Sequence, residues 1–155
     1  MFTWIQKRIA CCLPSNNDTA YLENISDKET NIFIPPIRFA KVIKVYDGDT
    51  ITVAAKLPFA KSPVYRFSVR LRSIDSPEIK GTSQQERELA ITSRDALHDM
   101  IFGKIIELKN NGKEKYGRVL ADIYYEDLHV NKWMVEKGYA LEYHGGKKTR
   151  GIDWD

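Results

Sequence analysis

Residues 39–74 alternate between apolar and polar side chains as β-strands do, and two turns that carry carboxylates interrupt or end this alternation. The first turn is Asp-Gly-Asp at 47–49, and the second is Asp-Ser-Pro-Glu at 75–78. A chain of this kind has to pair its strands, and pairing can bring acids from both turns to one place. Acids grouped on neighbouring strands are suited to binding a hard cation. We therefore expect a β-rich fold in which these turns are neighbours.

The rest of the pattern supports a small barrel. Alternating residues predict five strands, at residues 39–46, 50–55, 64–74, 104–109 and 117–125. Helices are predicted for 82–102, with Thr82 or Ser83 as the cap, and for 128–137. Asn-Asn-Gly at 110–112 predicts a turn between two of the strands. These elements indicate a β-rich α+β fold, and barrel closure would leave none of its strand edges exposed.

Length and charge limit the number of domains and the kinds of partner that the chain can have. The 155 residues suit one domain, which we expect over 37–155, preceded by an arm of residues 1–36. The net charge of +3 is too small to indicate a polyanionic partner by itself. No apolar run approaches the length needed to span a membrane.

The arm begins with a short amphipathic pattern in residues 1–13, where apolar residues recur at Phe2, Ile5, Ile9 and Cys12. The flanking Lys7 and Arg8, with acylation of Cys11 and Cys12, would favour peripheral membrane association. The alternatives are a frayed arm or a helix packed on the body. Residues 15–31 are polar and predict a flexible linker.

The same residues indicate a compartment. The adjacent Cys11 and Cys12 do not bridge easily and are the only cysteines, so we expect no disulfide within the chain. Lys7 and Arg8 interrupt the apolar run that a secretory signal would need. The cysteines alone fit a reducing compartment or a disulfide-free secreted protein, and with the poor signal we expect an intracellular, cytoplasmic protein. We also expect a monomer.

Two groups of charged residues could carry chemistry. The acids are Asp47, Asp49, Asp75 and Glu78, which could supply oxygen ligands to calcium, although each turn alone is more often structural. The cations are arginines, whose guanidinium groups match phosphate oxygens in pairs. Periodicity does not separate Arg70 from Arg72, and Arg118 stands far along the chain. The three histidines show no close metal-binding spacing.

Four motifs in order resemble the staphylococcal nuclease (thermonuclease) family. They are Asp-Gly-Asp-Thr at 47–50, Arg-Leu-Arg-Ser-Ile-Asp-Ser-Pro-Glu at 70–78, Lys-Tyr-Gly-Arg at 115–118 and the Val-Asn helix that starts at 130. Each motif is weak alone, but their shared order and spacing over about residues 40–144 are specific. The resemblance implies a five-stranded OB-fold barrel with two or three packed helices. It also implies a calcium-dependent endonuclease that hydrolyses DNA and RNA and leaves 3′-phosphate ends.

The resemblance assigns the metal-binding residues. Asp49 and Asp75 match the carboxylate ligands of calcium, and Asp47 matches an acid that lies behind them. Ser76 stands where the family usually has threonine and would bind the ion through its backbone carbonyl. Glu78 matches the general base that accepts a proton from the attacking water.

The resemblance also assigns the phosphate-binding residues. Arg70, rather than Arg72, and Arg118 match the two catalytic arginines. Lys115 and Tyr116 match residues that contact a terminal phosphate of the bound nucleotide. The base-stacking tyrosines do not align, and the candidates to replace them are Tyr139 and Tyr143. The turn near 111–112 is shortened, and a short tail replaces the last long helix of the family.

Two other functions remain open at this point. One is a catalytically silent module with the nuclease fold that binds nucleic acid or a protein partner. The other is an OB-type binder of single strands that uses aromatic stacking. The acidic cluster argues against simple binding, because carboxylates in a nucleic-acid groove repel phosphate unless a metal lies between them.

Overall fold

The structure is a computed structural model that describes residues 16–81 and 83–146. The chain divides into two compact units, residues 1–33 and residues 34–155. In the first unit, residues 16–23 form helix α1 (Asn16–Glu23), where the composition predicted a linker. A 3-10 turn, η1 (Asp27–Glu29), follows, and the Ser26 backbone N–H donates to the Glu29 carboxylate over 2.9 Å. The amphipathic helix predicted for residues 1–13 lies outside the described residues.

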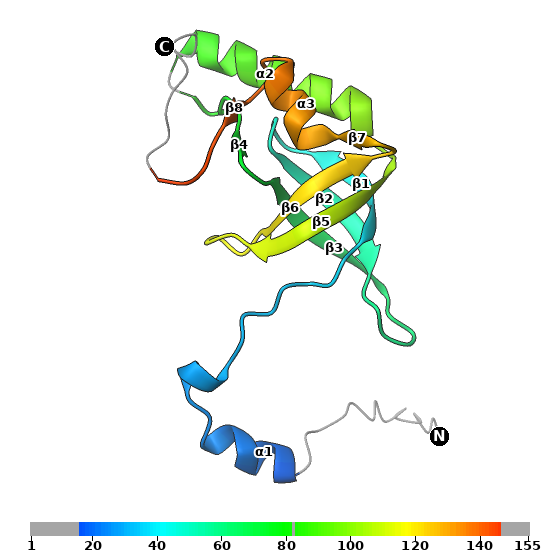
Figure 1. Ribbon diagram of the computed structural model, residues 1–155, viewed down its shortest axis with the longest axis vertical. Coiled ribbons are helices and arrows are strands. Elements are labelled where there is room, and N and C mark those ends of the chain that lie inside the picture. Colours follow the sequence, from blue (N-terminus) through cyan, green and yellow to red (C-terminus); the bar gives the residue numbers. More distant parts are fainter. Residues whose placement is uncertain (1–15, 82, 147–155) are drawn as a thin grey trace, which may run out of the picture. The chain divides into compact units, whose positions relative to one another are not determined.

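The second unit is the predicted five-stranded barrel (Figure 1). Its strands are β1 (Phe39–Val45), β2 (Thr50–Lys56), β3 (Val64–Leu71), β5 (Ile105–Lys113) and β6 (Val119–Tyr125). Neighbours pair antiparallel in the order β3-β2-β1-β5-β6, and a parallel pairing of β3 with β6 closes the barrel. The β-rich OB-fold prediction is therefore confirmed.

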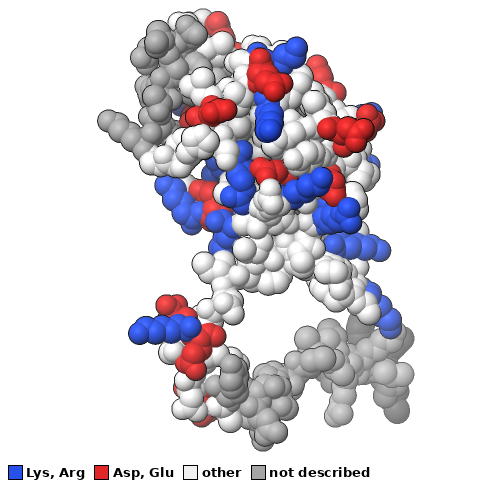
Figure 2. All heavy atoms as spheres, viewed as in Figure 1, with Lys and Arg blue, Asp and Glu red and all other residues white. Residues whose placement is uncertain are grey.

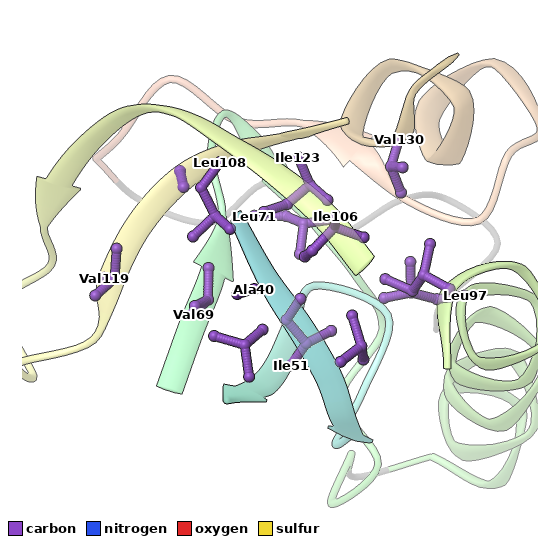
Figure 3. Packing of buried hydrophobic residues seen from close by; sticks show 14 of the residues in the cluster. Ala40, Ile51, Val69, Leu71, Leu97, Ile106, Leu108, Val119, Ile123 and Val130 are labelled. Carbon is purple, nitrogen blue, oxygen red and sulfur yellow. The ribbon is translucent and has the colours of Figure 1, made fainter. Parts of the chain in front are cut away.

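Alternation explains where the core lies. On β2, Ile51, Val53 and Ala55 are buried because every second side chain points into the barrel. Side chains from the five strands meet in the interior, and Leu97 and Val130 of the two helices close one end (Figure 3). This packing supplies the main stabilisation of the unit, since apolar burial contributes about 25 cal/mol per Å².

Two helices cover that end of the barrel, α2 (Gln84–Ile101) and α3 (Val130–Glu136) (Figure 1). The Ser83 hydroxyl caps α2 by accepting the Glu86 N–H over 2.9 Å. The buried Asn131 amide ties α3 to the barrel, because it accepts the Ile123 N–H and donates to the Arg72 carbonyl, each over 2.9 Å. No helix of the described residues has the length and apolar character needed to cross a membrane.

Short strands occupy places where the sequence predicted other elements. Leu128 and His129 form β7 (Leu128–His129) against β6, so the helix starts at Val130 rather than at 128. The strand predicted for 64–74 ends at Leu71. After Ser73, whose φ is 60°, the short strand β4 (Ile74–Asp75) pairs with β8 (Leu141–Glu142).

The turn predicted at 110–112 is wrong. These residues belong to β5, whose pairing with β6 shifts register between Lys109 and Gly112 as a bulge does. Arg72 packs over the bulge: a Cβ on Gly112 would lie 2.8 Å from the Arg72 Nη2 atom. The chain turns at 114–117 instead, where the Gly117 N–H donates to the Glu114 carbonyl over 2.9 Å.

Candidate active site

The turn between β1 and β2 holds two acids in a fixed, buried arrangement. The Asp49 N–H donates to an Asp47 carboxylate oxygen over 3.2 Å, and the Thr50 hydroxyl donates to Asp49 Oδ1 over 2.7 Å. Asp49 is only 3% exposed. A carboxylate so enclosed has few water contacts, so its charge has to be balanced by the protein or by a bound cation.

Arg70 joins the two acidic turns. Pairing of β2 with β3 sets Arg70 opposite Thr50, so its side chain lies beside the first turn. Its guanidinium donates to Asp49 Oδ2 through Nη1 and to Asp75 Oδ1 through Nη2, the latter over 2.9 Å. A third bond runs from Nη2 to the Ile74 carbonyl over 3.1 Å. The structure therefore brings together Asp47, Asp49, Asp75 and Arg70.

Arg72 has a different place. Its Nη2 atom donates to the Asn110 carbonyl and, over 3.4 Å, to the Leu120 carbonyl. It thereby bridges β5 and β6 at the bulge. The geometry separates the two arginines that periodicity left equivalent, and Arg70 is the one beside the acids.

The cluster shifts the pKa of two of its groups, Asp49 and Arg70. Burial and the neighbouring Asp47 carboxylate raise the pKa of Asp49 to about 7, although Arg70 and the Thr50 hydroxyl oppose the shift. Burial disfavours the charge of Arg70, but Asp49 and Asp75 outweigh it and raise the pKa of the guanidinium. One arginine is therefore insufficient compensation for this group of buried acids.

Arg118 reaches the same turn from the start of β6. Its Nη1 atom donates to the Thr50 hydroxyl over 3.1 Å, and its Nε lies 3.2 Å from a Glu114 carboxylate oxygen. Partial burial acts against ionisation of Glu114, but Arg118 outweighs it and lowers the pKa of that carboxyl. Sequence reasoning assigned no role to Thr50 or Glu114. Both stand inside or beside a quoted motif, but their contacts depend on strand pairing.

The second turn continues into an exposed loop. Ser76 is 3% exposed and directly follows Asp75, so its backbone is part of the buried end of the site. Glu78 stands three residues beyond Asp75 with an exposed side chain, and its carbonyl accepts the Gly81 N–H over 2.8 Å. Glu78 therefore lies on the solvent-exposed side of the buried acidic cluster.

Helix α2 supports the first turn directly. A Cβ on Gly48 would lie 1.8 Å from the Ser93 hydroxyl oxygen and 2.8 Å from the Ser76 Cβ. Only glycine allows this approach of the turn to the helix. Ser93 is itself held, because its hydroxyl donates to the Tyr139 carbonyl over 2.8 Å.

A cleft of about 560 Å³ opens beside the cluster, with Arg70, Lys115 and Tyr143 in its lining. Tyr116, adjacent to Lys115, is 74% exposed, and the Lys115 ammonium lies 4.8 Å from the centre of its ring. The two tyrosines proposed for stacking are thereby distinguished. Tyr143 lines this cleft, whereas Tyr139 packs at 5.5 Å against the Trp133 ring and lines a different groove.

The donor set suits a hard cation that keeps some ligands from outside the protein. Asp49 and Asp75 already converge on one positive group, and the buried Ser76 backbone adjoins them. Within 16–81 and 83–146, no group of three or more His, Cys, Asp and Glu side chains is placed to hold a metal ion by itself. Calcium accepts carbonyl, water and phosphate oxygens beside one or two carboxylates. The charge balance and donor chemistry of these residues therefore fit calcium.

The charged surface is mixed over the face shown in Figure 2. There, Lys and Arg side chains gather around the middle of the barrel unit, with Asp and Glu side chains between them. Ion pairs on β5 and its neighbours follow this pattern: Glu107 lies 2.9 Å from Arg38 and 3.3 Å from Lys109. The net charge of +3 thus does not arise from a uniform coat of cations.

Comparison with known proteins places this chain in one family. The family described as staphylococcal nuclease homologue matches residues 68–152. An endonuclease of Haemophilus influenzae, named as uncharacterized, is 36% identical over 103 residues, which cover 66% of this chain and 51% of that protein. A similarly named endonuclease of Escherichia coli is 31% identical over 104 residues, covering 66% and 60%.

A more distant relative comes from a plant. A probable staphylococcal-like nuclease of Oryza sativa is 31% identical over 78 residues, which cover 50% of this chain and 19% of that protein. The chain thus spans between 51% and 60% of the length of the two bacterial relatives described above. The family match extends over more than half of the chain and includes Arg70, Asp75 and Arg118. The chain belongs to the staphylococcal nuclease family.

Proposed function

We propose that this chain is a calcium-dependent endonuclease that hydrolyses phosphodiester bonds of DNA and RNA and leaves 3′-phosphate ends. The observation that carries the proposal is the convergence of buried Asp49 and Asp75 on the Arg70 guanidinium. Carboxylates alone would repel a phosphate, whereas a metal ion bound to them would attract it. The names of the relatives, which include endonucleases, support the same activity.

Asp49, Asp75 and the Ser76 carbonyl are the groups that would hold calcium, with Asp47 behind Asp49. When bound, calcium would supply positive charge for the phosphate oxygens and a polarised water. Arg70 pairs with both of these carboxylates. It could exchange one of these carboxylates for a phosphate oxygen only if another cation compensated the acids, so metal and substrate binding should support each other.

The reaction adds water across the P–O5′ bond. Water attacks phosphorus, the bond to the 5′ oxygen breaks, and the products are a 3′-phosphate and a 5′-hydroxyl. Glu78 would accept the proton of the attacking water, which suits an exposed carboxylate at the rim of the site. Arg70 and Arg118 would donate to the phosphate oxygens as negative charge builds on them. Lys115 and Tyr116, on the neighbouring turn, would contact a terminal phosphate.

Cleavage assays on the full chain test the proposal. Single-stranded DNA, duplex DNA and RNA are incubated with calcium chloride or with EGTA, and product ends are probed by phosphatase and by 5′-kinase labelling. We expect cleavage only with calcium, and 5′ ends that accept label without prior phosphatase. Binding of the same substrates without cleavage would instead support the catalytically silent module.

Calcium binding is tested separately by titration calorimetry. Asp75→Asn should weaken calcium binding at least tenfold, because one of two charged ligands becomes neutral. Asp127→Asn is the matched control, since Asp127 is exposed in the turn between β6 and β7. Equal calcium affinity of wild type and Asp75→Asn would refute the ligand assignment.

A further inference from the structure

The outer face of β1, β2 and β3 carries cations and no acids. The three strands contain five basic residues and no Asp or Glu, as read from their sequences: Lys41, Lys44, Lys56, Arg66 and Arg70. By contrast, β5 and β6 contain Glu107 and Asp122. Lys44 and Arg66 are exposed and form no salt bridge with the described part of the chain. Lys44 and Arg66 can therefore attract anions without competition from a carboxylate of the described residues.

Strand register joins this face to the candidate active site. Lys44 pairs with Thr52, and Thr52 pairs with Ser68, so the three side chains form a row across the strands. Two residues further along, about 6.6 Å away, Thr50 pairs with Arg70 at the acidic cluster. Because side chains two residues apart on a strand share a face, the row leads directly to the catalytic arginine.

The side chains of this row also line a cleft. Lys44, Thr52, Arg66 and Ser68 line a shallow cleft of about 450 Å³, with Ile43 at its side. Two cations and two hydroxyl groups are the donors that polynucleotide backbones meet most often. A hollow of this volume suits one nucleotide-sized group rather than a duplex. The cleft is separate from that lined by Lys115 and Tyr143.

We propose that Lys44 and Arg66, with Thr52 and Ser68, hold the backbone of a single-stranded polynucleotide beyond the cleaved bond. This track rests on the proposed function for the identity of its ligand and extends it to longer substrates. It makes affinity depend on chain length, because a single nucleotide at the acidic cluster would not span the four strand residues, about 13 Å, from Arg70 to Arg66. Phosphate contacts of this kind are electrostatic and independent of base sequence.

Binding in EGTA tests the track without requiring cleavage. Fluorescence anisotropy of the full chain with a labelled 12-nucleotide DNA and with a labelled mononucleotide is measured over a series of KCl concentrations. For the 12-mer, Lys44→Ala and Arg66→Ala should each weaken binding about two- to fivefold. Each should also reduce the slope of log affinity against log salt by about 0.7. Binding of the mononucleotide should not change.

Lys137→Ala is the control, because it removes one exposed charge at the end of α3. Its salt slope should equal that of wild type. Wild-type slopes in both Lys44→Ala and Arg66→Ala, in proteins with wild-type circular dichroism, would refute the track, even if calcium-dependent cleavage occurs. Reduced slopes with no cleavage of any substrate would support the track and refute the nuclease activity instead.

Discussion

The Arg118 guanidinium donates a hydrogen bond to the Thr50 hydroxyl over 3.1 Å, although the residues stand 68 positions apart. The same hydroxyl donates to Asp49, which Arg70 contacts directly. Both arginines are therefore connected to one buried carboxylate, Arg70 directly and Arg118 through Thr50. Substitutions along this connection should separate effects on catalysis from effects on folding.

Arg118→Ala should lower kcat by about 10²–10³, because one donor to the developing charge is lost. The variant should still fold, since the Arg118 side chain is 26% exposed and lies outside the hydrophobic core. Initial rates at saturating single-stranded DNA measure the effect. Arg94→Ala is the control: Arg94 pairs with Asp95 on α2 and should retain the wild-type rate. A rate within threefold of wild type in Arg118→Ala would contradict its catalytic role.

Thr50→Val should lower kcat by about 10- to 100-fold, because a hydrogen bond to a charged group contributes about 1.5–3 kcal/mol. Valine keeps the β-branched shape that suits β2 but cannot accept from Arg118 or donate to Asp49. KM should change less than kcat if Thr50 acts by positioning Arg118. Thr50→Ser retains the hydroxyl and should restore most of the rate. Equal losses in both variants would show that shape, not the hydroxyl, is required.

Asp49→Asn should stabilise the calcium-free protein at pH 8. The pKa of Asp49 is about 7 in the folded chain and about 3.9 when unfolded. Between these values the folded state binds more protons, so the wild-type unfolding free energy falls as pH rises from about 4 to 7. Asparagine removes this loss, which a pKa difference of about three units puts on the order of 4 kcal/mol at pH 8 and near zero at pH 4.

Urea unfolding in EGTA at both pH values measures this difference. Asp127→Asn, in an exposed turn, should show no such dependence. Added calcium should stabilise wild type and leave Asp49→Asn nearly unchanged, because the variant lacks a charged ligand. An Asp49→Asn protein less stable than wild type at pH 8 would show that the attraction of Arg70 outweighs burial.

Gly48→Ala should destabilise the barrel unit by about 1–3 kcal/mol, a typical cost of overpacking. The new Cβ would meet the Ser93 hydroxyl at 1.8 Å and the Ser76 Cβ at 2.8 Å. Combining it with Ser93→Ala removes the nearer clash, so a double-mutant cycle by thermal unfolding should show favourable coupling. At Gly103, whose φ is +75°, no atom lies within 4 Å, so Gly103→Ala should show no coupling with Ser93→Ala.

Much of this fold followed from local patterns. Alternation predicted all five barrel strands, and Ser83 and Gly103 correctly marked the limits of α2. The bulge at 110–112 was missed because Asn-Asn-Gly is a strong turn signal when only neighbours along the chain are considered. Packing of Arg72 over Gly112 holds this segment in the strand, and that contact joins residues 40 positions apart.

The sequence by itself determined which side chains are available for chemistry: acids on two turns, and arginines whose motif order indicates a nuclease. Only the tertiary structure decided which of them meet. Arg70 and Arg72 share a face by periodicity, and the pairing of Thr50 with Arg70 sets Arg70 beside Asp49. Tyr143 reaches the cleft, whereas Tyr139 packs on Trp133. Such meetings depend on register and barrel closure, which arise from long-range pairing and not from local residue order.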